Sequence, residues 1–402
     1  MMHQDMSRTA GRILLAFTSV AAPAAAGVSG ACAQTLTIVH NFTGGKDGGN
    51  PVDGFLMNAK GAMFATATSG GTAGNGAVFK LSGSGNETVL HSFAGGPEDG
   101  AAPNGGVIED AHGALYGTTT SGGTTNSGTV FRLKGTTETV LYSFAGGADG
   151  AGPQGSLAMD ANGNLYGTTY AGGAAGNGTV FELTPPKNGK GQWSETVLYS
   201  FAGGNDGAAP VAGVTLDAAG NLYGTTSAGG GAAGYGTVFE LSPGQAWTET
   251  ILHSFQNGDD GGTPYAGLIA DAAGNLYGAA TQGGANGGGT VFELSPTGSG
   301  RSFSVLTSQP GWGISGTFRN LMLDPSGTIY GTTHCDGADN AGTIFKLMPA
   351  NSGWTYTLLY TFTGGSDGLY SISNLVMKHG KLYGTTIQGG ANGYGVIYAL
   401  KP

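Results

Sequence analysis

Residues 163–183 read GNLYGTTYAGGAAGNGTVFEL, and close variants of this stretch recur along the chain. Aligning the copies on the tyrosine of LYG gives seven aromatic residues, which lie 50 to 57 residues apart. These residues are Phe64, Tyr116, Tyr166, Tyr223, Tyr277, Tyr330 and Tyr383. A period of this length is typical of the blades of a β-propeller. We therefore expect a closed array of seven similar units.

Each repeat contains four short runs that are rich in β-branched and aromatic residues. In one repeat they are Glu195–Phe201, Val211–Asp217, Asn221–Thr226 and Thr237–Leu241. Each run is bounded by Gly, Asp, Asn or Pro, as expected for strands that are joined by turns. Four strands make one propeller blade. The sequence thus predicts an all-β protein in which residues 34–402 form a seven-bladed β-propeller.

The order of the runs predicts how the ring closes. The first run after residue 34 is Thr37–Phe42, and the last in the chain is Gly395–Leu400. If Val211–Asp217 is the inner strand of one blade, then Glu195–Phe201 is the outermost strand of the blade before it. The N-terminal strand must then complete the last blade. Such closure removes the open sheet edges that invite aggregation.

Two local features of the repeat have clear structural causes. The segment Asp217–Asn221, which recurs at 160–164 and 271–275, offers a side-chain acceptor followed by a glycine that is free to adopt positive φ. This pattern predicts a hairpin turn. On the following strand, Gly224 is expected to leave room for a neighbouring aromatic ring.

The composition is that of a folded, turn-rich protein. Of the 402 residues, 81 are Gly and only 10% are charged. The absence of a Gly-X-Y period excludes collagen, and the regularly spaced Leu, Val, Tyr and Phe argue against disorder.

Residues 1–33 have the pattern of an export signal. Arg8 and Arg12 precede an apolar run, and Ala31-Cys32-Ala33 forms a small-x-small cleavage site. No other stretch approaches the length that a membrane-spanning helix needs. We expect a secreted, periplasmic or cell-envelope protein that is a monomer.

Removal of residues 1–33 would leave a net charge of about −11, because two arginines and one aspartate are lost. This charge, without any basic cluster, argues against nucleic acid and anionic membranes as partners. Cys335 would be the only remaining cysteine. An internal disulfide is then impossible, so stability must come from burial and from closure of the ring.

The stretches GNLYGTTYAGGAAGNGTVFEL and ETVLYSFAGGNDGAAPVAGVTLD resemble the GloVer tandem repeat of exported bacterial proteins. The resemblance covers residues 35–401. It implies an extracytoplasmic repeat protein and brings no catalytic motif with it. The DxxGNLY turn is also similar to that of NHL-type propellers, which include binding scaffolds and a few lyases and lactonases, although this analogy concerns the fold alone.

Two kinds of loop are expected on one face of the ring. The first leads into each inner strand with the pattern Phe-x-Gly-Gly-x-Asp-Gly, and we call it the Asp loop. The second joins the NLYGTT and TVFEL runs, carries paired glycines, and is called the Gly-Gly loop. The aspartates of the Asp loops are Asp47, Asp99, Asp149, Asp206, Asp260 and Asp367.

These six aspartates are weak candidates for binding calcium. Calcium takes several oxygen ligands, whereas each loop offers one carboxylate and the strings DxDxDG and GGxGxD do not occur. Capping of the loop by the aspartate side chain is the favoured interpretation. We therefore expect no metal and no cofactor, with calcium as the alternative.

Histidines and catalytic motifs give little support for an enzyme. Three histidines stand where sister repeats have tyrosine, and we interpret them as aromatic replacements rather than metal ligands; they are His40, His91 and His253, opposite Tyr142, Tyr199 and Tyr360. The motifs HExxH, CxxC and the Walker loop do not occur in the sequence, and its one GxSxG string, at residues 364–368, falls in an Asp loop and is not a nucleophile elbow.

The repeat breaks in the sixth blade. Its Asp loop is replaced by residues 308–313, which include Trp312, and its Gly-Gly pair is replaced by His334-Cys335-Asp336. Arg319 lies near the start of the inner strand of this blade. Together, Trp312, Arg319, His334 and Asp336 are candidates for holding a sugar or a peptide by stacking and polar contacts. The alternative is sequence drift in one redundant repeat.

We expect the protein to bind a glycan or an extracellular protein without catalysis, on the loop face or at the channel mouth. Loops on a rigid scaffold suit recognition. A propeller lyase or hydrolase is the first alternative. It requires an acid/base pair at the channel mouth, built on His334, Asp336 and Arg319. A structural cell-envelope protein is the second alternative.

Overall fold

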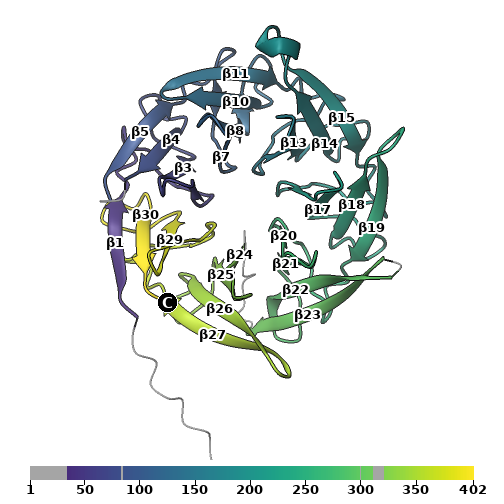
Figure 1. Cartoon of the computed structure of the whole chain (residues 1–402). Coiled ribbons are helices and arrows are strands. Elements are labelled where there is room, and N and C mark those ends of the chain that lie inside the picture. The colour runs from purple at the N-terminus through teal and green to yellow at the C-terminus, as the bar shows by residue number, and fades with distance from the viewer. Residues whose placement is uncertain (1–33, 83–84, 299, 311–320) are drawn as a thin grey trace, which may run out of the picture. The chain divides into compact units, whose positions relative to one another are not determined.

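The structure is a computed structural model, and it describes residues 34–82, 85–298, 300–310 and 321–402. The predicted signal peptide lies outside these residues, as do Trp312 and Arg319. Seven four-stranded antiparallel sheets surround a central channel (Figure 1). The predicted all-β, seven-bladed propeller is confirmed.

In blades 1 to 6 the strands follow one another from the channel outward. Blade 1 comprises β2 (Leu56–Met57), β3 (Met63–Ala67), β4 (Ala77–Leu81) and β5 (Glu87–Ser92). Blade 2 comprises β7 (Ile108–Glu109), β8 (Leu115–Thr119), β10 (Thr129–Lys134) and β11 (Thr137–Ser143). Blade 3 comprises β12 (Ala158–Met159), β13 (Leu165–Thr169), β14 (Thr179–Thr184) and β15 (Ser194–Ser200).

Blades 4 to 6 repeat this order. Blade 4 comprises β16 (Thr215–Leu216), β17 (Leu222–Thr226), β18 (Thr237–Ser242) and β19 (Thr248–Ser254). Blade 5 comprises β20 (Ile269–Ala270), β21 (Leu276–Ala280), β22 (Gly287–Thr297) and β23 (Gly300–Pro310). Blade 6 comprises β24 (Met322–Leu323), β25 (Ile329–Thr333), β26 (Thr343–Ala350) and β27 (Gly353–Thr361).

Blade 7 closes the ring with both ends of the propeller. It consists of β28 (Val376–Lys378), β29 (Lys381–Thr386), β30 (Val396–Leu400) and β1 (Leu36–Asn41). β1 pairs antiparallel with β30, from Leu36 opposite Leu400 to Asn41 opposite Val396. The predicted closure by the N-terminal strand is confirmed.

The remaining elements lie in the connections. β6 (Gly100–Ala101) and β9 (Ser121–Gly122) pair with each other. The single helix among the described residues is the 3-10 turn η1 (Lys187–Gly189). No described helix has the length and apolar character that crossing a membrane requires.

The inner strands are shorter than the sequence predicts. The run Val211–Asp217 forms a ladder only at β16, over two residues. Before β16, a hydrogen bond to the adjacent blade is made instead: Thr168 Oγ1 of blade 3 donates to the carbonyl oxygen of Ala212 at 2.8 Å. The same bond links blades 1 and 2, 2 and 3, and 4 and 5, where Thr66, Thr118 and Thr225 donate to Gly105, Gly155 and Ala266. Interblade hydrogen bonds thus take the place of ladder bonds near the channel.

Glycine in the LYG run makes room for an aromatic ring, as predicted. A Cβ placed on Gly224 would lie 2.5 Å from Cζ of Phe239. Phe239 is opposite Gly224 on the next strand of the same blade, so the ring comes from within the blade. Blade 1 alone has alanine here among the LYG positions, at Ala65 opposite Phe79.

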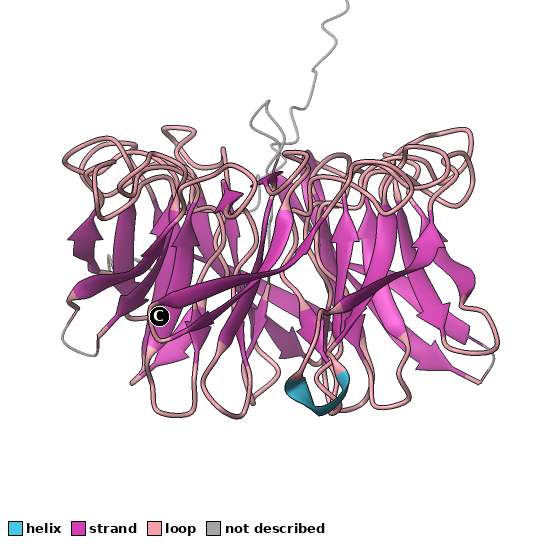
Figure 2. Ribbon diagram, turned by 90° about the horizontal axis from the view of Figure 1, so that it is seen from above, coloured by secondary structure: helices cyan, strands magenta, loops and turns pink. Residues whose placement is uncertain are grey.

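The predicted hairpin turns are present. Asp217 Oδ1 accepts a hydrogen bond from the backbone N–H of Asn221 at 2.9 Å, and Gly220 has a φ of 88°. Short turns of this kind occupy one face of the ring, and longer loops crowd the other (Figure 2). The two faces therefore offer different surfaces to a partner.

Candidate functional site

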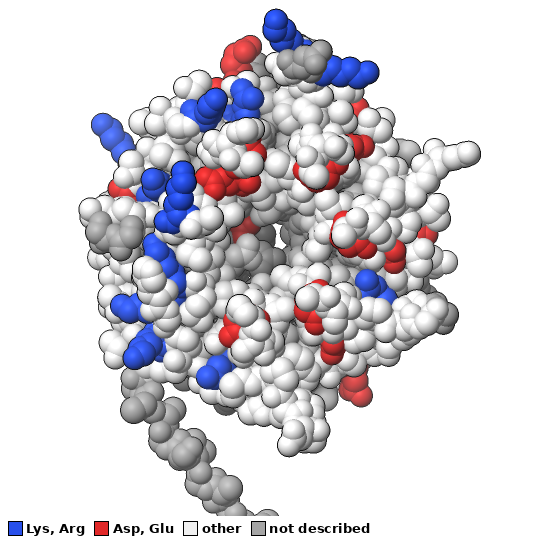
Figure 3. All heavy atoms as spheres, viewed as in Figure 1, with Lys and Arg blue, Asp and Glu red and all other residues white. Residues whose placement is uncertain are grey.

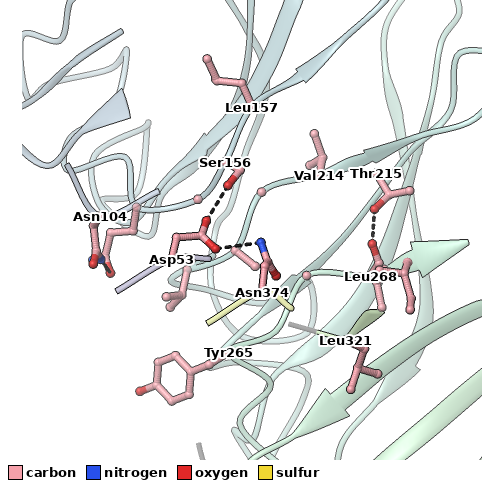
Figure 4. A pocket seen from close by; sticks show the side chains of 17 residues that line it. Asp53, Asn104, Ser156, Leu157, Val214, Thr215, Tyr265, Leu268, Leu321 and Asn374 are labelled. Atoms are coloured by element: carbon pink, nitrogen blue, oxygen red, sulfur yellow. Dashed lines mark hydrogen bonds between the residues drawn. The ribbon is translucent and has the colours of Figure 1, made fainter. Parts of the chain in front are cut away.

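A cavity of about 200 Å³ opens at the channel, between the segments that lead into the inner strands (Figure 4). One position of the repeat supplies much of its lining. The backbone of this position is similar from blade to blade, but the side chain varies: Asn104, Gln154, Val211 and Tyr265. Asn104 Nδ2 donates to Gln154 Oε1 at 3.3 Å. The cavity is thus lined by amide, phenol and aliphatic groups on a constant scaffold.

Asp53 is the buried carboxylate of this cavity, with 7% of its surface exposed. Its Oδ1 accepts hydrogen bonds from Gly54 N and Asn374 Nδ2, both at 2.7 Å. Its Oδ2 accepts from Gly106 N at 2.6 Å and from Ser156 Oγ at 2.7 Å. The donors come from blades 1, 7, 2 and 3, so one carboxylate ties four blades together.

Sequence reasoning missed Asp53, although a signal was present. Sister repeats carry Gly105, Gly155 and Ala212 at the equivalent position. A carboxylate that replaces a Gly or Ala beside a predicted channel is unusual, because a buried charge requires dedicated donors. Arg319, which lies outside the described residues, occupies the same repeat position in blade 6.

The Asp loops and the Gly-Gly loops share one face, as predicted. They form β-bridges with each other in several blades, for example Gly49 with Ser69 and Ala151 with Ala171. Each Asp loop leads into an inner strand, so these loops surround the end of the channel on this face. Two tyrosines of the Gly-Gly loops are strongly exposed, Tyr170 at 45% and Tyr394 at 43%. The loop face therefore presents two exposed aromatic rings.

Each Asp-loop aspartate caps its own loop. Asp149 Oδ2 accepts hydrogen bonds from Ala145 N at 2.8 Å and from Tyr142 OH at 3.0 Å. Asp206 and Asp367 make the same pair of bonds with a backbone N–H and a tyrosine. In the other three loops a histidine Nε2 stands in place of the phenol; the pairs are His40 with Asp47, His91 with Asp99 and His253 with Asp260.

The structure describes two of the four predicted blade-six residues. The ring of His334 stacks on Tyr370 with centroids 4.1 Å apart, and its Nδ1 contacts Cys335 Sγ. Asp336 Oδ1 accepts a hydrogen bond from Gly337 N at 2.8 Å. Burial raises the pKa of the Cys335 thiol. These contacts orient His334 toward blade 7, whereas Asp336 bonds to the backbone of its own loop.

A set of outer-strand glutamates was also missed. They begin the Glu-Thr-Val or Glu-Thr-Ile runs of the outer strands, and each is half-buried at a blade interface: Glu87, Glu138, Glu195 and Glu249. Burial, with an added contribution from a nearby aspartate, raises the pKa of each carboxyl to about 7. The recurrence of Glu at one position was visible in the sequence, but the aspartate that it meets was not.

Charge on the face toward the viewer of Figure 1 is arranged around the channel. Figure 3 shows acidic side chains gathered around the central opening, with Lys and Arg mostly toward one side of the rim. Such an arrangement disfavours the approach of a polyanion to the opening.

A family model described as the Gloeobacter/Verrucomicrobia repeat matches residues 28–232 and 187–398. No curated protein sequence matches the chain. Among solved structures, a proposed 6-phosphogluconolactonase of Bacteroides uniformis is similar at 15% identity, with a TM-score of 0.52 over 83% of this chain and 89% of that chain. A fungal alcohol oxidase of the AA5 family, in complex with copper, is similar at 15% identity, with a TM-score of 0.54 over 92% of this chain and 76% of that chain. Similarity at this identity shows the propeller fold alone.

Proposed function

The chain belongs to the Gloeobacter/Verrucomicrobia repeat family, and we propose that its propeller binds a glycan outside the cytoplasm, at the channel mouth on the loop face. The observation that carries this proposal is the varied repeat position at the cavity, which presents Asn104, Gln154 and Tyr265. Amides donate and accept hydrogen bonds at once, as sugar hydroxyls do. A constant backbone with a varied lining is the arrangement expected of a recognition site.

The size of the cavity favours one end of a glycan chain. Its volume of about 200 Å³ is below the ~300–1,000 Å³ typical of sites that enclose a drug-sized ligand. A terminal sugar unit matches this volume better than an extended ligand does. The remaining sugars would lie across the loop face, where Tyr170 and Tyr394 offer exposed rings for stacking.

Binding without catalysis is favoured over the lyase or hydrolase alternative because the sequence carries no HExxH, CxxC or Walker motif. The similar enzymes support only the fold, so neither lactone hydrolysis nor alcohol oxidation is proposed for this chain.

A binding screen on residues 34–402 against glycans and cell-wall polymers, with and without calcium, tests the proposal. The double substitution Asn104→Ala and Gln154→Ala should abolish binding of a terminal sugar. Tyr170→Ala with Tyr394→Ala should weaken binding of longer chains more than that of short ones. The control Leu358→Ala alters a side chain that is 47% exposed on the outer strand β27 and should leave binding unchanged.

The same screen separates the alternatives. Loss of binding in Trp312→Ala with His334→Ala, but not in the channel-mouth variant, would place the site on blade 6 instead. Shortened or unsaturated products, detected by mass spectrometry, would show an enzyme. If no polymer binds the parent protein, the recognition proposal fails and the structural cell-envelope alternative takes its place.

A further inference from the structure

Three potential metal ligands meet at the interface between blades 1 and 2. His91 lies on β5, Asp99 lies in the following Asp loop, and Glu138 lies on β11, the outer strand of blade 2. One ligand atom from each of the three lies within 4.8 Å of the others. Glu138 lies far from His91 and Asp99 in the sequence, and the packing of blade 1 against blade 2 brings the three residues together.

The geometry of this group is close to what a small cation needs. His91 Nε2 and Asp99 Oδ1 are 3.4 Å apart, which is roughly the separation of two ligands around a tetrahedral ion with bonds of about 2.0–2.1 Å. The His91 ring packs edge-on against Phe93, with centroids 4.8 Å apart, which holds its orientation. Asp99 Oδ2 accepts a hydrogen bond from Ala94 N at 2.7 Å. Oδ1 accepts one from Gly100 N at 2.7 Å and is also the oxygen that faces the imidazole.

Glu138 supplies the third atom, one of its carboxylate oxygens. Of its two oxygens, Oε1 is buried and has no hydrogen-bond partner among the described residues. A buried oxygen without a donor costs free energy, commonly about 1–3 kcal/mol, unless a proton or a cation satisfies it. The corresponding oxygens of Glu87, Glu195 and Glu249 share this property, so Glu138 differs from its sister residues in what faces it, not in its own burial.

The other interfaces show why this set is unusual. At the next two interfaces Tyr142 and Tyr199 replace the histidine, and burial raises the pKa of both phenols above the usual range, so they stay protonated and are poor ligands. At the blade 4–5 interface His253 is present, but Phe303 takes the place of the glutamate and stacks on the imidazole at 3.7 Å. Only the interfaces containing His91 and His40 combine the three ligand types among the described residues, and the His91 set is the one whose atoms converge.

We propose that His91, Asp99 and Glu138 bind a divalent first-row transition metal ion, with Zn²⁺ as the best match, and so clamp blade 1 to blade 2. One imidazole nitrogen with two carboxylate oxygens is a ligand set that Zn²⁺ accepts, and a fourth position is left for solvent. Calcium prefers an all-oxygen shell of six to eight ligands, which this set does not provide.

The test is calorimetric titration of ZnCl₂ into metal-free residues 34–402, repeated with MnCl₂ and CaCl₂. His91→Tyr is the decisive variant, because tyrosine is the natural residue at this position in sister blades and should preserve the fold. It should remove one equivalent of bound Zn²⁺, or weaken its affinity about tenfold or more, and Glu138→Gln should do the same. The control His253→Tyr makes the identical change where Phe303 stands in for the glutamate, and Zn²⁺ binding should not change.

Thermal melting gives a second measurement, because a ligand that binds only the folded state raises the melting temperature. Zn²⁺ should raise it for the parent and for His253→Tyr by more than for His91→Tyr. Three results would overturn the proposal: no Zn²⁺ bound by the parent, the same Zn²⁺ binding after His91→Tyr, or tighter binding of Ca²⁺ than of Zn²⁺.

Discussion

At the scale of single residues, Asp53 shows how one carboxylate organises the channel. Among the described residues it accepts four hydrogen bonds of 2.6 to 2.7 Å, from donors in four blades. Hydrogen bonds to a charged group contribute more than neutral ones. The residue is therefore expected to stabilise the ring as well as to shape the cavity.

Asp53→Ala should destabilise residues 34–402 by about 2–5 kcal/mol, because Gly54 N, Asn374 Nδ2 and Ser156 Oγ lose the carboxylate that accepts from them. Urea unfolding followed by circular dichroism measures the change. The matched control is Asp259→Ala at an exposed position, which should stay within about 0.5 kcal/mol of the parent. Equal stability of the two variants would contradict the role assigned to Asp53.

The outer-strand glutamates predict how stability depends on pH. Glu195 and Glu249 have pKa values raised from 4.5 to about 7 in the folded protein. The folded state therefore holds the proton more tightly than the unfolded state does. Their contribution to stability is fully present below about pH 4.5 and is lost as the pH rises through about 7.

Replacing both residues, Glu195→Gln with Glu249→Gln, should raise the melting temperature relative to the parent at pH 8. It should change it little at pH 5, where the glutamates are already mostly protonated. Melting scans of both proteins at the two pH values give the comparison. The same difference at both pH values would show that these carboxyls are not held in the neutral form by the fold.

At the scale of elements, threonines rather than ladder bonds connect the inner segments. Thr168 is buried, and its hydroxyl donates to Ala212 of the next blade. The matching hydroxyl in blade 6, Thr332 Oγ1, is buried without a partner among the described residues. The same side chain at the same repeat position is thus bonded in one blade and unbonded in another.

Thr168→Val should cost about 1–2 kcal/mol, because the carbonyl of Ala212 loses its donor. Thr332→Val should be neutral or stabilising, since a methyl group replaces a hydroxyl that has no hydrogen-bond partner among the described residues. Chemical unfolding of the two variants beside the parent tests both expectations. An equal loss in both would mean that packing volume, and not the interblade hydrogen bond, sets the cost.

At the scale of the whole molecule, stability depends on closing the ring. β1 supplies the outer strand of blade 7, pairs along β30 and carries His40, which bonds to Asp47 in the loop that leads into blade 1. This strand links the first and last segments of the propeller through backbone hydrogen bonds, beside side-chain bonds such as that of Asn374 with Asp53. Removing it would expose the edge of β30.

A chain that begins at residue 42 should therefore melt at a lower temperature and aggregate, whereas residues 34–402 should not. Size-exclusion chromatography with thermal melting checks this. A peptide of residues 34–42 added in trans should partly restore the monomer, and a peptide of scrambled sequence serves as its control. An unchanged melting temperature without β1 would show that blade 7 is stable with three strands.

Much of this architecture was readable from the sequence because its causes are local. The DxxGN turn needs one aspartate and one glycine with positive φ, as at Asp217 and Gly220. The glycine of the LYG run leaves space for an aromatic ring on the adjacent strand, as Gly224 does for Phe239. The exchange of His91 for tyrosine in sister repeats was also visible in the sequence, but its contact with Asp99 of the Asp loop came only from the structure. The predicted length of the inner strands was wrong, because the residues before these short strands form hydrogen bonds with the neighbouring blade.

The repeat period, the strand runs and the single strand at each end determined the blade count and the closure, since each depends on residues close in sequence. Only the tertiary structure decided which side chains meet across blades. Asp53 and Asn374 are 321 residues apart in the chain but share a hydrogen bond, and Glu138 reaches His91 and Asp99 only because adjacent blades pack face to face. Both the cavity and the proposed metal site lie at such junctions, because closing a ring of repeats brings together residues that no local pattern relates.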